Sequence, residues 1–215
     1  MAGRHFLLAL AGAFLVGACG ESLPPPGPPA QLVKSGGDQQ SWFFDNPLPI
    51  AYRVTVEDAN GRGVPGVTVV WAVTAGGGSI TAFGAVTDGD GRASATHTLG
   101  PSETSQQATA TVVDLSPSTF TATAGDPPTT VGVSIQNNSF NPDLVGIQAG
   151  GTVTWTWNSG SVDHNVTFTG GPQPLPTNST TKNSGTYPWT FNATGTYTYV
   201  CNIHAGMSGR VVVVQ

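Results

Sequence analysis

Four side chains of the kinds that bind soft metal ions lie in the second half of the chain. Cys201, His204 and Met207 are separated by gaps of two residues, and His164 precedes them. A thiolate, two imidazoles and a thioether form the ligand set of a mononuclear copper site that transfers single electrons. After the first twenty residues Cys201 is the only cysteine and Met207 the only methionine. This grouping indicates that the four side chains act together.

Each of these residues also has a purely structural interpretation, because buried Cys and His are common and Met often fills a core. Zinc is the chemical alternative, since it also binds Cys and His, whereas the thioether favours copper. Two imidazoles and a thiolate in one plane with a weak axial thioether accommodate both Cu(I) and Cu(II). We therefore predict one copper ion that alternates between these two states.

Strands must position these ligands. Apolar and polar residues alternate, or valines dominate, in four stretches of the C-terminal part: 131–135, 153–157, 197–201 and 210–215. This period of two predicts a small sandwich of strands, and no stretch has a convincing helical pattern. Cys201 shares its strand face with Tyr197 and Tyr199, which points its side chain inward.

The loop that begins at Cys201 can present three ligands to one centre because of its two-residue gaps. His164 must come from a different strand, so the site connects two parts of the sandwich. A loop rich in Pro, Asn and Thr at 170–185 is a candidate for the rim of the site, and the sequence does not fix its position.

The chain between Gln31 and about Gly125 also predicts strands. Alternating segments are separated by turn sequences and occur at 50–57, 67–74, 93–99, 107–113 and 119–123. The Asp-Gly-rich segments 58–61 and 88–91 resemble fragments of calcium loops, but without the remaining ligands they are better explained as hairpin turns. We expect His97, on the strand 93–99, to be a solvent-facing or capping polar residue.

Two motifs in this part carry a family resemblance. The segment 54–71 reads VTVEDANGRGVPGVTVVW, and it is followed by AGGGS at 75–79 and TDGDGRA at 87–93. These segments resemble a bacterial immunoglobulin-like domain of group 1, the type found in invasin- and intimin-like surface proteins. The resemblance implies a spacer or adhesive module without chemistry of its own, and a single copy favours a spacer.

The C-terminal part resembles a cupredoxin of the plastocyanin/amicyanin kind. The resemblance rests on FNP at 140–142, IQAG at 147–150, TVTW at 152–155, HNVTF at 164–168 and GTYTYVCNIHAGMSGRVVV at 195–213. The short ligand loop is closer to that of amicyanin. The resemblance implies that His164, Cys201, His204 and Met207 fill the four copper-ligand positions. It also implies that Asn165 braces the site and donates towards the thiolate.

From the same resemblance we expect His164 to lie deep and His204 to lie near the surface, within an apolar patch. His204 would then be the exit route for electrons. Four protein ligands leave no open position for a substrate, so we do not expect an enzyme.

The N-terminus has the features of an export sequence. Arg4 precedes an apolar stretch at 6–16 that is too short to span a bilayer, and the stretch ends in LVGAC with Cys19 last. This ending resembles the lipobox of bacterial lipoproteins and implies acylation of Cys19, although an ordinary secretory signal is the alternative. If Cys19 is acylated, Cys201 has no disulfide partner, and metal binding would protect this thiol in an oxidising compartment.

Composition limits the partners. The chain has 7 basic and 12 acidic residues, and no run of Lys or Arg supports nucleic-acid binding. After Pro127 the only charged residues are Asp143, Asp163, Lys182 and Arg210, so the C-terminal part is nearly neutral. Its docking to a redox protein would depend only weakly on salt.

The predicted protein is all-β, with two sandwich domains in tandem. We expect a signal peptide at 1–18, a Pro-rich stiff tether at 19–30, an immunoglobulin-like domain at 31–126 and a cupredoxin domain at 127–215. The expected function is that of a monomeric, lipid-anchored blue copper protein that carries electrons between redox partners. It would lie in the bacterial cell envelope, on the periplasmic side of the outer membrane or at the cell surface. Copper storage or delivery, and surface adhesion with an accessory copper domain, remain as alternatives.

Overall fold

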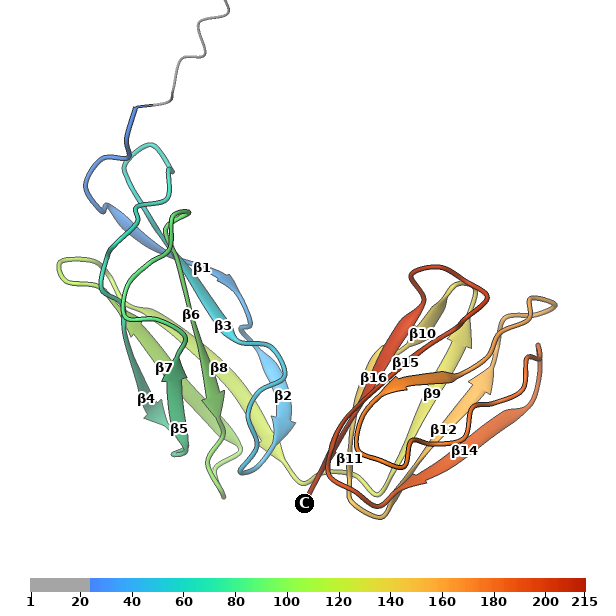
Figure 1. The fold of residues 1–215 in the computed structure, drawn as a ribbon. Helices are drawn as coiled ribbons and strands as arrows, with labels where there is room; N and C mark the ends of the chain where they lie inside the picture. The colour runs from blue at the N-terminus through green and yellow to red at the C-terminus, as the bar shows by residue number, and fades with distance from the viewer. Residues whose placement is uncertain (1–23) are drawn as a thin grey trace, which may run out of the picture.

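The computed structural model describes residues 24–215, and both the expected signal peptide and Cys19 lie outside them. The described residues form sixteen strands and no helix, grouped into two sandwiches that follow each other along the chain (Figure 1). Among these residues no helix has the length and apolar character needed to cross a bilayer. The predicted all-β fold with two sandwiches in tandem is confirmed.

The N-terminal sandwich consists of two four-stranded sheets. One sheet has the order β1-β3-β6-β5 and the other the order β2-β8-β7-β4. The strands are β1 (Gln31–Gly36), β2 (Gln40–Phe43), β3 (Tyr52–Glu57), β4 (Val70–Ala75), β5 (Ser79–Ala82), β6 (Arg92–Thr98), β7 (Ser105–Thr111) and β8 (Ser118–Gly125). All five strands expected in this part are present, whereas β1, β2 and β5 were not predicted. They carry too few apolar residues to show a period of two.

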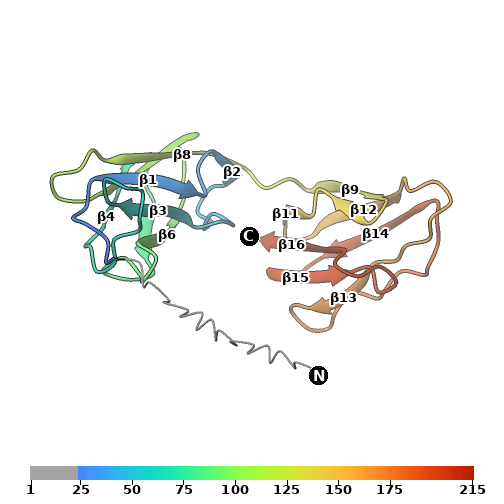
Figure 2. The same cartoon turned by 90° about the horizontal axis from the view of Figure 1, so that it is seen from above.

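The C-terminal sandwich also has two four-stranded sheets, ordered β10-β9-β12-β14 and β11-β16-β15-β13 (Figure 2). The strands are β9 (Thr130–Gln136), β10 (Ser139–Asn141), β11 (Leu144–Gln148), β12 (Gly151–Trp157), β13 (Thr167–Gly170), β14 (Thr186–Phe191), β15 (Gly195–Val200) and β16 (Ser208–Val214). Two pairings are parallel, β9 with β12 and β11 with β16, so successive strands cross between the sheets.

Each sandwich has its own apolar core, and the two cores share no buried residue. In the C-terminal core Trp155 is fully buried and makes edge-on contacts with Phe168 and Tyr199, at ring-centroid distances of 5.8 and 5.3 Å. Such aromatic pairs stabilise a core beyond the area that they bury. Tyr199 belongs to β15, so this aromatic packing holds the strand that leads directly to Cys201.

The position of His97 differs from the prediction. Its side chain is fully buried on β6, and its Nδ1 lies 3.3 Å from the Tyr52 hydroxyl. A strand has a period of two, so His97 shares its face with Ala95 and Leu99, which are buried as well. The expectation of a solvent-facing residue was wrong because this face packs against the second sheet.

The start of the described chain is held against the N-terminal sandwich. Asp58 is buried, and its carboxylate accepts hydrogen bonds from Gly27 N at 2.8 Å and from the Arg62 guanidinium at 2.7 and 2.9 Å. Arg62 also donates to the Pro24 carbonyl at 3.0 Å, and Ala30 N donates to Glu57 O at 2.8 Å. These hydrogen bonds hold the Asp58 pKa well below its usual range. Residues 24–30 are thus mostly exposed but held against the N-terminal sandwich.

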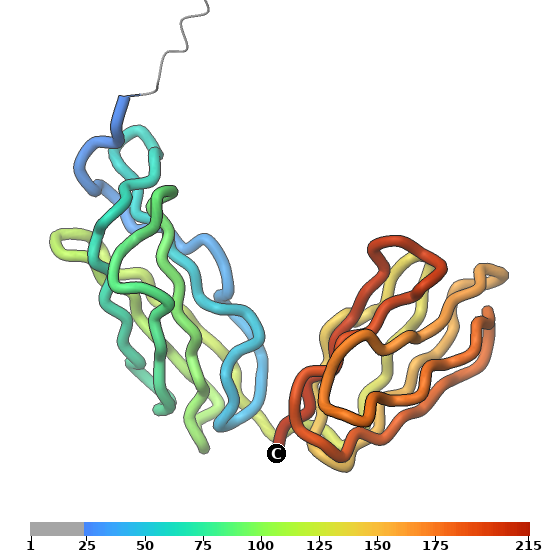
Figure 3. Tube along the Cα trace, in the orientation of Figure 1, coloured from blue at the N-terminus to red at the C-terminus, as the bar shows by residue number. Residues whose placement is uncertain are grey.

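The strand register places the proposed ligand loop at the end of its sandwich that is remote from the first domain. The chain enters β9 at Thr130, which pairs with Thr152 at the start of β12. Ile135 and Trp157 pair at the opposite end, beyond which lies His164. The tube in Figure 3 shows this order, with the loop between β15 and β16 at the same end as the chain that follows β12.

The two sandwiches approach each other closely at Gly146. Gly146 on β11 is buried and lies directly under the stacked rings of Trp42 and Phe43 from β2. A Cβ atom at position 146 would lie 2.7 Å from Trp42 Cη2 and even closer to the Phe43 ring. Only glycine permits this approach.

Candidate metal centre

The ligand loop is fixed by the strands on either side of it. β15 and β16 are antiparallel neighbours, and their last pair before the loop is Val200 with Ser208. Residues 201–207 therefore form a hairpin loop. Within it Cys201 N donates to Met207 O at 3.0 Å, which closes the loop at its base. His204 N donates to Cys201 O and Met207 N to His204 O, each at 3.4 Å.

His164 comes from the segment between β12 and β13. Its N–H donates to Lys182 O at 2.8 Å and its carbonyl accepts from Lys182 N at 3.0 Å, which makes an isolated antiparallel bridge. The predicted separation into one loop and one distant strand segment is therefore present.

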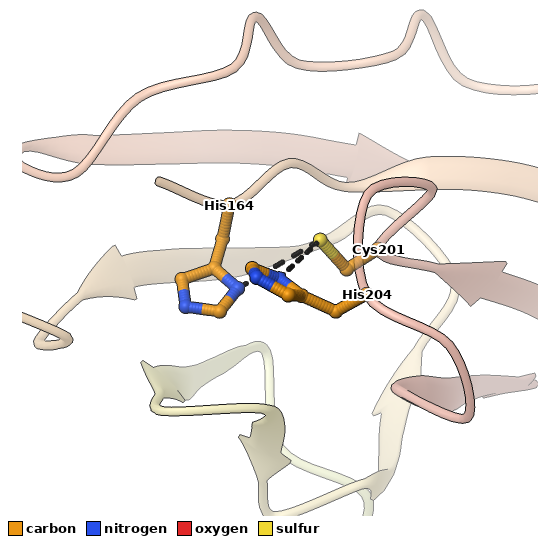
Figure 4. A group of neighbouring side chains, drawn as sticks. All are labelled: His164, Cys201 and His204. Atoms are coloured by element: carbon orange, nitrogen blue, oxygen red, sulfur yellow. Dashed lines mark hydrogen bonds between the residues drawn. The ribbon is translucent and has the colours of Figure 1, made fainter. Parts of the chain in front are cut away.

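The three strongest candidate ligands converge on one point. The Cys201 sulfur lies 3.7 Å from His164 Nδ1 and 3.5 Å from His204 Nδ1, as the dashed lines in Figure 4 show. All three ligand atoms lie within 4.8 Å of one another. The two imidazole rings are tilted by 47° and their centroids are 4.4 Å apart.

These separations fit a shared metal ion. With bonds of about 2.0 Å to nitrogen and about 2.3 Å to sulfur, as in zinc sites, two ligands at 120° are about 3.7 Å apart. The observed distances of 3.5 and 3.7 Å match this value. Met207 is buried at the end of the same loop, so a thioether is available as a weak fourth ligand.

The two histidines differ in exposure, as expected. His164 is fully buried, whereas His204 is partly exposed. Its chain neighbour Ile203 is a large apolar residue with 49% exposure. An exposed apolar side chain therefore adjoins His204, in agreement with the expected apolar patch.

Burial sets the protonation state of His164. It lowers the pKa of this imidazole, the positive charge of His204 lowers it further, and Asp163 acts weakly in the opposite direction. A metal binds the neutral imidazole, so this environment favours the form that coordinates.

Asn165 connects the two ligand-bearing segments. Its Oδ1 accepts from Asn202 N at 3.0 Å, and its Nδ2 donates to Asn202 Oδ1 at 2.6 Å and to Thr181 Oγ1 at 3.0 Å. It therefore links the His164 segment to the loop that carries Cys201. Its side-chain amide donates to these oxygens, and no hydrogen bond from Asn165 to the Cys201 sulfur is present among the described residues.

Two residues near the site were not predicted. Trp157 donates from Nε1 to the His164 carbonyl at 3.0 Å, and Lys182 pairs with the His164 backbone. The alternating stretch 153–157 includes Trp157, but its spacing in the strand gives no sign of the hydrogen bond. Lys182 lies in the loop 170–185, whose path depends on tertiary contacts.

Comparison with known proteins identifies the family. A family model described as copper binding proteins, plastocyanin/azurin family, matches residues 128–214. Amicyanin-alpha from Methylorubrum extorquens is 41% identical over 83 residues, which cover 38% of this chain and 69% of that protein. The chain belongs to the plastocyanin/azurin family of copper-binding proteins. As in this family, its cofactor is one type 1 copper ion.

The N-terminal half matches a second family model, that of the bacterial Ig-like domain (group 1), over residues 45–133. This copper protein therefore carries an immunoglobulin-like domain before its cupredoxin domain, and both predicted resemblances are confirmed.

Several solved structures are similar to it. A purple cupredoxin from Nitrosopumilus maritimus is 28% identical, with 39% of this chain and 99% of that chain covered and a TM-score of 0.35. An oxidised amicyanin mutant is 32% identical, with 40% and 82% covered and a TM-score of 0.36. A copper-containing nitrite reductase from Thermus scotoductus is 16% identical, with 69% and 54% covered and a TM-score of 0.37.

Proposed function

We propose that this chain is a lipid-anchored blue copper protein that carries single electrons between redox proteins of the bacterial cell envelope. His164, Cys201, His204 and Met207 would hold the ion. The observation that carries the proposal is the convergence of two Nδ1 atoms on the Cys201 sulfur at 3.5 and 3.7 Å.

Electron transfer is favoured over catalysis by the ligand count. Two imidazoles, a thiolate and a thioether fill the coordination positions of a trigonal site with a weak axial ligand, so no position is left for a substrate. Copper bound there would exchange one electron between Cu(II) and Cu(I).

Electron transfer is also favoured over copper delivery. The hydrogen bonds within the loop, together with those of Asn165 and Lys182, hold the ligands in place before metal binds. Ligands that move little on reduction keep the reorganisation cost low, whereas a delivery protein must open its site. The partly exposed His204, beside Ile203, would pass electrons to a redox partner that docks on this near-neutral surface.

The anchor and the domain limits are further parts of the proposal. The sequence at Cys19 supports acylation after removal of residues 1–18, with residues 19–30 leading to the first domain. Separate cores support an immunoglobulin-like domain at 31–126 and a cupredoxin domain at 127–215. We expect the protein to be a monomer in the periplasm or at the cell surface.

The copper site is tested by visible and EPR spectra of the purified protein with Cu(II). We expect intense absorption from thiolate-to-copper charge transfer, and we expect Cys201→Ser to abolish it. Cys19→Ser is the matched control and should keep the full absorption. A colourless wild-type protein, or an unchanged spectrum in Cys201→Ser, would contradict the proposal.

Lipid anchoring is tested separately by labelling cells with an alkyne fatty acid. The wild-type protein should carry the label and fractionate with membranes. Cys19→Ala should lose the label, whereas Cys201→Ser should keep it. An unlabelled wild-type protein would argue for an ordinary secreted protein.

A further inference from the structure

The segment 178–182 runs along the strand segment that carries His164. We call residues 178–182 the His164 strap. Two of its side chains accept hydrogen bonds from the backbone of segment 164–168: Asn178 Oδ1 accepts from Phe168 N at 2.9 Å, and Ser179 Oγ accepts from Val166 N at 2.8 Å. The backbone N of Ser179 donates to Val166 O at 3.0 Å, and Thr181 Oγ1 accepts from Asn165 Nδ2 at 3.0 Å. The strap ends at Lys182, directly opposite His164.

The backbone of His164 is held from two sides. Its carbonyl accepts two hydrogen bonds of 3.0 Å, one from Lys182 N and one from the indole Nε1 of Trp157. Trp157 is only 5% exposed, so its N–H has little access to water. Both donors limit the rotation of the residue that supplies the buried imidazole.

The side chain of Lys182 extends this arrangement. Its ammonium lies 4.3 Å from the centre of the Trp157 ring and donates to the Thr186 carbonyl at 2.8 Å. A cation over an indole face is attracted by the ring quadrupole. The backbone N of Trp157 donates to Gly185 O at 3.0 Å, which fixes the chain between Lys182 and Thr186. Lys182 is half-buried, and it is the only lysine after residue 127.

We propose that Lys182 and Trp157 form one support for the copper site, with separable tasks. Trp157 positions His164 through its indole N–H, and Lys182 provides a fixed positive charge that raises the reduction potential. This inference rests on the proposed function, because it assumes copper at His164, Cys201 and His204. Copper with one thiolate carries a net charge of +1 when oxidised and 0 when reduced. A nearby cation that is partly shielded from water therefore favours the reduced form.

Lys182 is tested by the midpoint potential of three purified copper-loaded variants. Lys182→Met removes the charge but keeps much of the chain length, and we expect a lower potential with intact blue absorption. Lys182→Arg keeps the charge and should keep the potential near that of the wild type. Lys34→Met removes the other lysine, which lies in the N-terminal domain, and should leave the potential unchanged. An unaltered potential in Lys182→Met, or an equal shift in Lys34→Met, would overturn the electrostatic role.

Trp157 is tested by the copper EPR spectrum and by the rate of copper loss to a chelator. Trp157→Phe keeps an aromatic face for Lys182 but loses the N–H donor. The loss of one hydrogen bond, worth about 1 kcal/mol, corresponds to copper release about fivefold faster. We expect this acceleration together with altered EPR hyperfine splitting. Trp189→Phe on β14 is the matched control and should match the wild type in both measurements.

The outcomes separate the two proposals. A wild-type protein without blue absorption would refute the proposed function. If the wild-type protein is blue, and Trp157→Phe matches it in EPR spectrum and in copper-release rate, only the positioning role of Trp157 is refuted. Circular dichroism identifies a variant that fails to fold, in which case the Lys182 series still decides the electrostatic role.

Discussion

Asn165 shows how one side chain can connect two ligand-bearing segments. It is 97% buried, as its exposed fraction is 3%, and it uses both its oxygen and its nitrogen. Because its partners belong to the His164 strap and to the ligand loop, loss of its amide affects both at once. Loss of the amide would leave its hydrogen-bond partners on Thr181 and Asn202 unpaired, and unpaired buried polar groups lower the stability of the fold.

We expect Asn165→Ala to lower the free energy of unfolding of the cupredoxin domain by about 2–3 kcal/mol, since several buried hydrogen bonds are lost. The measurement is urea unfolding of the copper-free protein. Asn202→Ala is the comparison, because it removes one side-chain acceptor and keeps the backbone N–H that binds Asn165. It should cost about 1 kcal/mol. Equal effects of the two variants would show that the bracing is not specific to Asn165.

For individual residues, the sequence predicts the candidate site best where the residue types are rare. Cys201 and Met207 are the only residues of their kinds among residues 24–215, so their spacing alone indicates a site. Lys182 could not be predicted in the same way. Lysine is a common surface residue, and its contact with Trp157 arises from tertiary folding of the loop 170–185.

At the scale of strands and loops, the N-terminal sandwich has a buried titratable group far from any proposed chemistry. His97 has its Nδ1 near the Tyr52 hydroxyl, and its Nε2 is buried without a hydrogen-bond partner among the described residues. Burial lowers the pKa of this imidazole, so the folded domain favours its neutral form. The period of two in β6 already places His97 beside Ala95 and Leu99, so the burial could have been predicted from the sequence.

This burial predicts a loss of stability in acid. In the unfolded chain His97 has its usual pKa of about 6.5, so below that pH the unfolded state binds a proton that the folded state does not bind. The free energy of unfolding is unaffected by His97 above pH 6.5. Below this pH it decreases by up to about 1.4 kcal/mol per pH unit as the pH falls towards the folded-state pKa of His97. Hydrogen exchange of β6 and β8 between pH 7.5 and 5 measures it. His97→Gln should flatten this pH dependence, and an equally steep dependence in the variant would assign the effect to other groups.

For the whole molecule, Gly146 and the Trp42–Phe43 pair limit how the two domains can move. The linker at Asp126–Pro128 contributes stiffness, because proline restricts its own backbone and that of the preceding residue. The alternation of apolar and polar residues along the strands predicted two domains. It did not predict this contact, because an apolar residue on an edge strand fits the same alternation whether it packs on a second domain or faces solvent.

We expect Gly146→Leu to separate the domains without affecting copper. The new side chain would collide with the Trp42 and Phe43 rings. Subtilisin should then cleave the linker between Gly125 and Thr130 faster than in the wild type, while the copper absorption stays the same. Gly132→Leu is the matched control, since nothing lies within 4 Å of a Cβ atom at that position. Equal cleavage of both variants and the wild type would mean that the contact does not restrain the linker.

The buried Asp58 carboxylate has a consequence for the space in which the protein can search for partners. Because Asp58 and Arg62 fix the chain from Pro24 onward, only five residue steps separate the fixed part from Cys19. Fully extended, they span at most about 18 Å. A protein acylated at Cys19 would therefore stay close to the lipid surface and would meet its partners by lateral diffusion. Collisions in two dimensions would favour partners anchored in the same leaflet over freely diffusing ones.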